Sequence, residues 1–201
     1  RLVFQNPAVR SLYDDLNQAL VDLGDHQKQM GRTQDAQRSY REALEVLTLV
    51  PRETAAEMFQ LALLHAAQMT ATDSSDNAGR EASPSDEDRQ HHADLALEAL
   101  RQSVDMGWAD PEALKSSRVL DSLRQQAEFR EVEAAVTTIA KVARLLKERG
   151  TTERETLDTR SKAAELLRQY ADQNPRRTLH HGALAATWEA LGETQLALGQ
   201  F

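Results

Sequence analysis

Proline and glycine are scarce in this 201-residue chain, and most of them separate stretches whose apolar residues recur every three or four positions. Pro7, Pro51, Pro111 and Pro175 each stand beside the start of such a stretch, where the missing N–H of proline costs nothing. The commonest residues favour helix. No alternating apolar and polar run bounded by turn residues predicts a strand. We therefore expect an all-α fold.

The apolar spacing also predicts where the helices lie. The first helix carries Leu12, Leu16, Leu20 and Leu23 on one stripe and runs to about Met30. A second follows and ends before Pro51. A third helix is expected at about Arg52–Met69, with Met58, Leu61 and His65 on one face, and a fourth at about Asp88–Asp105. Short helical turns are expected at Pro111–Ser116 and Val119–Arg124. Longer helices should follow at 126–149, 152–173 and 176–198.

The segment from Thr70 to Gln90 has a different composition. It holds six acidic residues and two arginines, with Ser, Gly and Pro among the rest. Such a segment cannot bury enough apolar surface to offset its ordering entropy. We expect a disordered acidic loop at 71–88 that interrupts a helical hairpin.

The overall composition excludes several classes of protein. The absence of cysteine removes disulfide scaffolds, thiol catalysis and thiolate zinc sites. Asp and Glu number 32 against 24 Lys and Arg, which disfavours binding to nucleic acid. No apolar run approaches the roughly 20 residues of a membrane helix, and the start of the chain has no signal-peptide pattern. We expect a cytoplasmic protein with no membrane partner.

One helical unit occurs near both ends of the chain. A gapless shift of 168 residues aligns residues 1–33 with 169–201. The identical pairs are Gln5, Asn6 and Pro7 with Gln173, Asn174 and Pro175, Leu16 with Leu184, Leu23 and Gly24 with Leu191 and Gly192, Gln27 with Gln195, and Gly31 with Gly199. Repeated helical units bury their cores against one another.

The first unit resembles the tetratricopeptide repeat (TPR). The residues that match this motif are Leu20, Leu23, Gly24, Gly31, Ala36, Tyr40 and Ala43, with Pro51 after the hairpin. Small residues at Gly24, Ala36 and Ala43 would let two helices approach closely, and Tyr40 would fill the gap between them. The resemblance implies a TPR-like α-solenoid of antiparallel helix hairpins with a divergent middle section.

The middle of the chain is similar to the repeat regions downstream of the kinase domain in planctomycete-type bacterial serine/threonine kinases. The segments that carry this similarity are 107–114 (GWADPEAL), 120–123 (LDSL) and 128–129 (EF). It implies a non-catalytic region of a longer signalling protein, whose parent could be a serine/threonine kinase.

These resemblances predict one helical repeat region over residues 1–201. Its parts are a first repeat at 6–51, a divergent repeat with the acidic loop at 52–107, short irregular helices at 108–136, a helical hairpin at 137–175, and the first helix of a truncated repeat at 176–201. The last helix would lack a second half to cover Leu191 and Leu198. We therefore expect self-association through the truncated ends.

The TPR resemblance also implies a ligand site on the concave face built from the first helices. The family's binding positions correspond here to Val21, Asp25 and Lys28, to Phe59 and Leu63, and to Glu189 and Glu193. The Lys and Asn of the family's carboxylate clamp are absent from Val21 and Asp25, so binding of chaperone tails is not expected.

An apolar strip of Phe59 and Leu63 beside Asp25 would suit an amphipathic or extended segment with a basic flank. In the alternative, helices after Trp108 cover Phe59 and Leu63, which then belong to the core.

Signatures of catalysis and of metal binding are missing. Neighbours in the pairs His91-His92 and His180-His181 point about 100° apart on a helix and cannot clamp one metal. His65 stands at a core-aromatic position of the repeat, where burial is expected. Phosphate-loop, kinase and nucleophile-elbow motifs are absent. We expect no catalytic residues, no metal and no cofactor, and a chain that is not an enzyme.

The leading functional hypothesis is a non-catalytic scaffold that binds a protein or peptide on its concave helix face. The alternative is a self-association segment that oligomerises an attached catalytic domain such as a kinase. An enzyme of unfamiliar type is a third possibility, and it would require a cleft with converging titratable groups.

Overall fold

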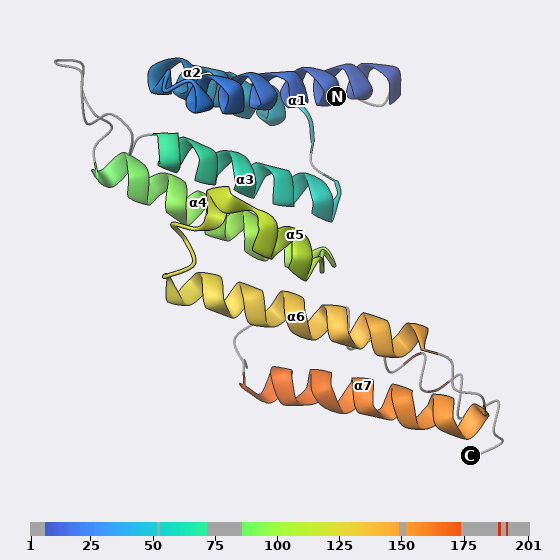
Figure 1. The fold of residues 1–201 in the computed structure, drawn as a ribbon. Helices are drawn as coiled ribbons and strands as arrows, with labels where there is room; N and C mark the ends of the chain where they lie inside the picture. The colour runs from blue at the N-terminus through green and yellow to red at the C-terminus, as the bar shows by residue number, and fades with distance from the viewer. Residues whose placement is uncertain are drawn as a thin grey trace.

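The computed structural model describes residues 7–51, 53–71, 86–148 and 152–173, together with Glu189 and Gly192. The helices within these ranges are α1 (Pro7–Gln29), α2 (Thr33–Leu49), α3 (Ala55–Ala71), α4 (Asp86–Asp105), α5 (Pro111–Ser116), the 3-10 turn η2 (Arg118–Leu120), α6 (Ala127–Lys147) and α7 (Glu153–Gln173). The described ranges contain no strand, so the expected all-α fold is confirmed (Figure 1).

The observed helix bounds differ from the predicted ones mainly around the acidic segment. α3 extends to Ala71, and α4 begins at Asp86, so the edges of the predicted loop are helical. Asp86, Glu87 and Asp88 lie in the first turn of α4, where negative charge interacts favourably with the helix dipole. The rest of that loop, at 72–85, lies outside the described residues. The helix expected at 176–198 also lies outside them, apart from Glu189 and Gly192.

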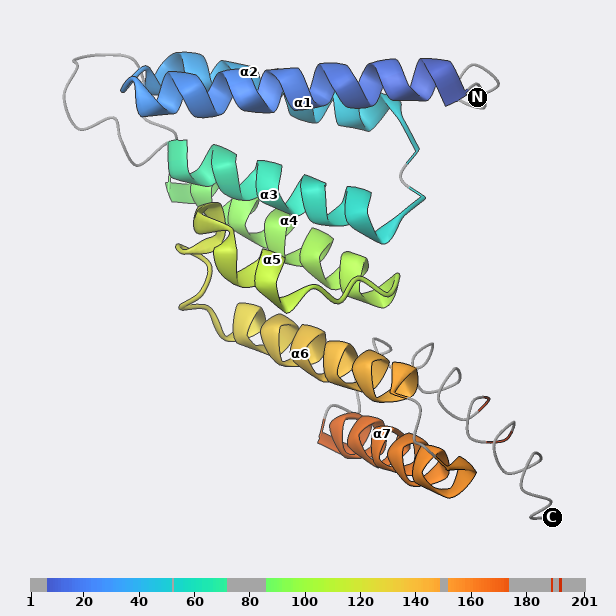
Figure 2. The same ribbon diagram turned by 45° about the vertical axis from the view of Figure 1, so that its right-hand side comes forward.

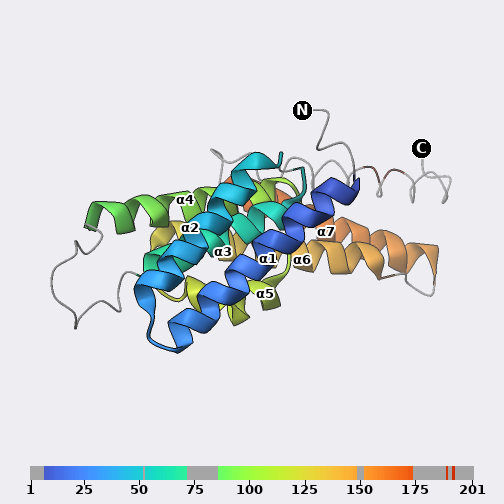
Figure 3. The same cartoon turned by 90° about the horizontal axis from the view of Figure 1, so that it is seen from above.

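The helices are stacked in chain order as hairpins. α1 packs against α2, α3 against α4, and α6 against α7, with α5 and η2 between the second and third pairs (Figures 1 and 2). α2 also packs on α3, and α4 on α6. The first hairpin therefore lies at one end of the stack, as the view from above shows (Figure 3).

Glycines end two of the helices where the chain must turn sharply. Gly31 has a φ of 74° after α1, and Gly107 has a φ of 94° after α4. In each case the next residue donates its backbone N–H to a carbonyl five residues earlier, from Arg32 to Gln27 at 2.8 Å and from Trp108 to Ser103 at 2.9 Å. This is the Schellman arrangement, and it satisfies carbonyls at the helix end.

Side chains fix the starts of α3 and α5. At α3, Thr54 and Glu57 form a capping box, in which each backbone N–H donates to the other's side chain at 3.0 and 3.3 Å. The side chain of Asp110 caps α5 by accepting from the N–H groups of Glu112 and Ala113. Pro111, at the first position of α5, is among the residues that the sequence associated with a helix start.

The buried side chains form one large and one small cluster. The large cluster runs from α2 through α6 and includes Tyr40, Leu100, Leu120 and Phe129, all fully buried, as well as Tyr170 of α7. Between α6 and α7 the small cluster is formed by Val142, Ala163 and Leu167. Most of α7 thus packs on α6 through this small cluster, which is separate from the large one.

The first hairpin closes around Tyr40, as the residue spacing predicted. Tyr40, Ala36 and Ala43 are fully buried, and a Cβ atom placed on Gly24 would lie 2.5 Å from Cε1 of Tyr40. The phenol also donates a hydrogen bond to Oδ1 of Asp25 at 2.6 Å. Glycine is therefore required at position 24 for α1 and α2 to approach this closely.

The apolar stripe of α1 is not the face that packs. Leu12, Leu16 and Leu23 are 67%, 48% and 46% exposed, whereas Leu20 packs against the core. The buried face of α1 instead includes Asn17, whose Nδ2 donates to the carbonyl of Ala43 at 2.8 Å. The spacing located a stripe correctly, but no described helix covers most of it.

Replacing Gly24 with alanine should lower the free energy of unfolding by about 1–3 kcal/mol, because the new methyl group overpacks the ring of Tyr40. Urea denaturation followed by circular dichroism measures this. In the double variant Gly24→Ala/Tyr40→Leu the crowding is relieved, so its loss should be smaller than the sum of the two single losses. Strictly additive losses would contradict the contact.

Candidate functional site

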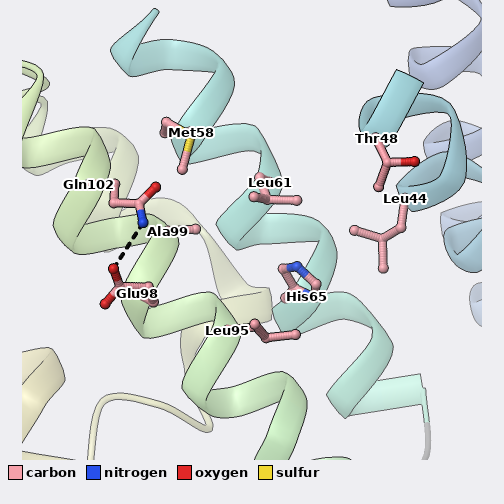
Figure 4. A pocket seen from close by; sticks show the side chains of 9 residues that line it. All are labelled: Leu44, Thr48, Met58, Leu61, His65, Leu95, Glu98, Ala99 and Gln102. Atoms are coloured by element: carbon pink, nitrogen blue, oxygen red, sulfur yellow. Dashed lines mark hydrogen bonds between the residues drawn. The ribbon is translucent and has the colours of Figure 1, made fainter. Parts of the chain in front are cut away.

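An apolar groove lies between α2, α3 and α4 (Figure 4). Its lining residues are Leu44 and Thr48 from α2, Met58, Leu61 and His65 from α3, and Leu95, Glu98, Ala99 and Gln102 from α4. The volume is about 270 Å³. Small-molecule pockets usually measure about 300–1,000 Å³, so the groove is better suited to a protruding side chain than to a whole small ligand.

The groove has a buried apolar floor and a polar rim. Met58 and Leu61 are buried at its base, on the face of α3 that the sequence identified as apolar. The exposed residues Thr48, Glu98 and Gln102 form the rim. Because both α2 and α4 pack on α3, the space between their outer edges stays open above this floor.

A second depression, which we call the acidic hollow, lies between α4 and the start of α6. It is lined by Gln90, Asp94, Leu95, Leu97, Glu98 and Arg101 of α4, with Gln126 and Glu128, and its volume is about 510 Å³. Leu95 and Glu98 line both the groove and the hollow. The two depressions therefore lie on either side of one exposed ridge of α4.

Two carboxylates of this ridge are held by amides one helical turn away. Nε2 of Gln102 donates to Oε1 of Glu98 at 2.9 Å (Figure 4), and Nε2 of Gln90 donates to Oδ1 of Asp94 at 2.8 Å. Within the described part of the chain, neither carboxylate has an ion-pair partner. The amides thus position both groups without adding positive charge.

A pair of histidines joins α3 to α4 beside the groove. Nδ1 of His65 lies 3.2 Å from Nδ1 of His92, a geometry in which one ring donates and the other accepts. Burial lowers the pKa of His92, and the charges of His91 and Arg41 lower it further, while Asp88 opposes them. His65, which the sequence placed in the core, is half-buried.

The structure places Phe59 in the core. Its side chain is 7% exposed and its ring stacks on that of Trp108, with 3.9 Å between the ring centroids. Leu63 is half-buried and packs against the same cluster. For Phe59 this is the alternative that the sequence left open, and its ring is therefore not exposed to a partner.

The predicted binding residues of α1 make contacts within the fold. Asp25 accepts from Tyr40 at 2.6 Å, Nζ of Lys28 lies 2.7 Å from the hydroxyl of Thr70, and Val21 packs against the core. Burial raises the pKa of Tyr40, and the hydrogen bond to Asp25 raises it further.

Of the two predicted binding residues near the end of the chain, Glu189 is exposed, and Glu193 lies outside the described residues.

The residue spacing in the sequence did not predict the groove. The sequence did predict the apolar helix face that forms its floor, since Met58, Leu61 and His65 share a helical spacing. The walls, however, come from Leu44 and Leu95, which lie on two other helices, so their proximity depends on how three helices pack. No residue spacing in the chain carried that information.

No family model matches the chain, and neither the curated proteins nor the solved structures contain a significant match to it. Among the described residues, no cluster of three or more histidine or acidic side chains is arranged to hold a metal ion. Within the same residues, none of the helices has both the length and the apolar character needed to cross a bilayer.

The lowered pKa of His92 predicts a loss of stability in mild acid. The unfolded chain takes up a proton near the ordinary histidine pKa of 6.5, whereas the folded chain resists it. The free energy of unfolding should therefore be greatest above that pH and fall as the pH drops through the folded value, by at most about 1.4 kcal/mol per pH unit.

Urea unfolding at neutral pH and at a pH of about 5.5 measures this effect. His92→Gln should reduce the pH dependence, and His26→Gln, at an exposed position of α1 that does not contribute to the His92 shift, serves as the control. An equal reduction in both variants would contradict the assignment to His92.

Proposed function

We propose that this chain is a TPR-like α-solenoid and acts as a non-catalytic protein-interaction module. The stacking of helix hairpins in chain order supports this architecture. So does the contact between Gly24 and Tyr40, which occurs at the positions where the repeat motif requires small and large residues. A stack of this kind presents long surfaces on which an extended segment or a helix can lie.

The observation that carries the proposal is the apolar groove. It combines a buried floor at Met58 and Leu61 with an accessible polar rim, the layout by which grooves between helices accept an apolar side chain of a partner. The groove is a better ligand site than the face predicted from α1 and α3, because Phe59 there is stacked on Trp108.

Consecutive positions of α2 provide a matched test of the groove. Thr48 lines the groove and Leu49 does not, while both are exposed. Peptides selected from a random-sequence display library on the wild-type protein should bind Thr48→Glu about fivefold or more weakly, because a carboxylate beside an apolar anchor costs at least about 1 kcal/mol. They should bind Leu49→Glu normally.

Fluorescence anisotropy of the labelled peptides gives the dissociation constants, and circular dichroism checks that both variants fold. Equal affinities for Thr48→Glu and Leu49→Glu would place the binding site elsewhere. A library that yields no binding peptide would count against the interaction module itself.

Self-association is a second candidate function, and the exposed stripe of α1 favours it. Val9, Leu16, Leu23 and Met30 recur every seven residues, with Leu12 between the first two, which is a heptad-like spacing. Most of these side chains are exposed. A second copy of the chain presents the same stripe, and two such stripes can pack together as in a coiled coil.

The variant Leu16→Glu/Leu23→Glu should remove any concentration-dependent increase in mass, because it places charge in the centre of the stripe. Light scattering coupled to gel filtration measures the mass. Ser11→Glu/Gln18→Glu adds the same charge at exposed positions of α1 outside the stripe and should leave association intact. A wild-type mass that stays at the 22.5 kDa of one chain at every concentration would exclude this candidate.

A further inference from the structure

We infer that the partner of the apolar groove is a segment in which a large apolar residue is flanked by lysine or arginine. This inference rests on the proposed function, and it adds the charge of the partner. Three features of the structure carry it: the adjacency of the groove and the acidic hollow, the sign of the charges around them, and the way in which the carboxylates are held.

The groove and the acidic hollow adjoin each other at the ridge of α4. Leu95 and Glu98 line both depressions, so a segment that crosses α4 with an apolar side chain in the groove must pass over the hollow. Residues next to the apolar anchor then face Asp94 and Glu98, and on the far side Glu128 at the start of α6. The partner's flanking residues therefore contact this acidic surface.

The charges on this surface favour a basic flank. The hollow is lined by Asp94, Glu98 and Glu128 against the single cation Arg101, and the groove adds only neutral polar residues to its rim, Thr48 and Gln102. An acidic flank would bring like charges together. A basic flank is attracted electrostatically to each carboxylate, and the net charge of −8 on the chain favours the approach of a basic partner.

The positions of the carboxylates also suit a cation. Gln102 and Gln90 hold Glu98 and Asp94 through neutral amide donors, which restricts their rotamers before a partner arrives. Preorganised acceptors lose less side-chain entropy when they bind a lysine or an arginine. The Glu98 side chain marks the boundary between the apolar and the acidic part of the site.

Three synthetic helical peptides of equal length test the inference. Each carries the same central leucine pair, and the residues beside it are lysine in one peptide, glutamine in the second and glutamate in the third. We expect the lysine peptide to bind most tightly and the glutamate peptide most weakly. Added salt should bring the affinity of the lysine peptide close to that of the glutamine peptide.

Single charge removals assign the effect to this surface. Glu98→Gln and Glu128→Gln should each weaken the lysine peptide about two- to fivefold, the range of an exposed ion pair. Glu128 lines the hollow and not the groove, so Glu128→Gln should leave the glutamine peptide unchanged. Glu42→Gln removes an equal charge from an exposed position of α2 outside both depressions, and it should have no comparable effect. Isothermal titration calorimetry gives all of these affinities.

The possible failures are distinguishable. If the glutamine peptide binds in a manner sensitive to Thr48→Glu but the lysine peptide binds no better, the charge inference is overturned and the interaction module stands. Equal effects of Glu42→Gln and Glu98→Gln would also overturn it, because the preference would then reflect overall charge. If none of the three peptides binds, both the charge inference and the apolar anchor of the proposed function fail.

Discussion

The close approach of α1 and α2 at Gly24 is the contact on which the first hairpin, and its packing on the next layer, depend. Without a side chain at Gly24, the ring of Tyr40 can lie against the backbone of α1 and still reach the carboxylate of Asp25. Tyr40 belongs to the same buried cluster as residues of α3 and α4. One ring therefore sets the spacing within the first hairpin and also ties that hairpin to the next layer.

Much of the fold could be predicted from the sequence, because helix ends are local. Glycine and proline positions located the turns, and apolar spacing located the helices between them. What could not be predicted is which stripe finds a neighbour. Leu12, Leu16 and Leu23 have the spacing of a buried face, yet Asn17 and Gly24 pack instead. Periodicity identifies a face, whereas burial depends on the arrangement of other helices.

The candidate site illustrates the same limit. Phe59 suited a binding face by its place in the repeat pattern, but the chain after α4 returns and stacks Trp108 on it. The groove that does exist is built from residues on three helices, and the acidic surface beside it adds residues from a fourth. Such sites follow from tertiary packing, and the local signals for them are ordinary leucines and glutamates.

The division of the buried side chains into two clusters bears on how the chain loses structure. α7 is held mainly by the small cluster around Val142, Ala163 and Leu167, whereas the groove stands on the large cluster. Stacked units of this kind can open locally, one after another, rather than all at once. Fraying of α7 alone would therefore leave the groove in place, so this helix can yield to mechanical or thermal strain while the groove persists.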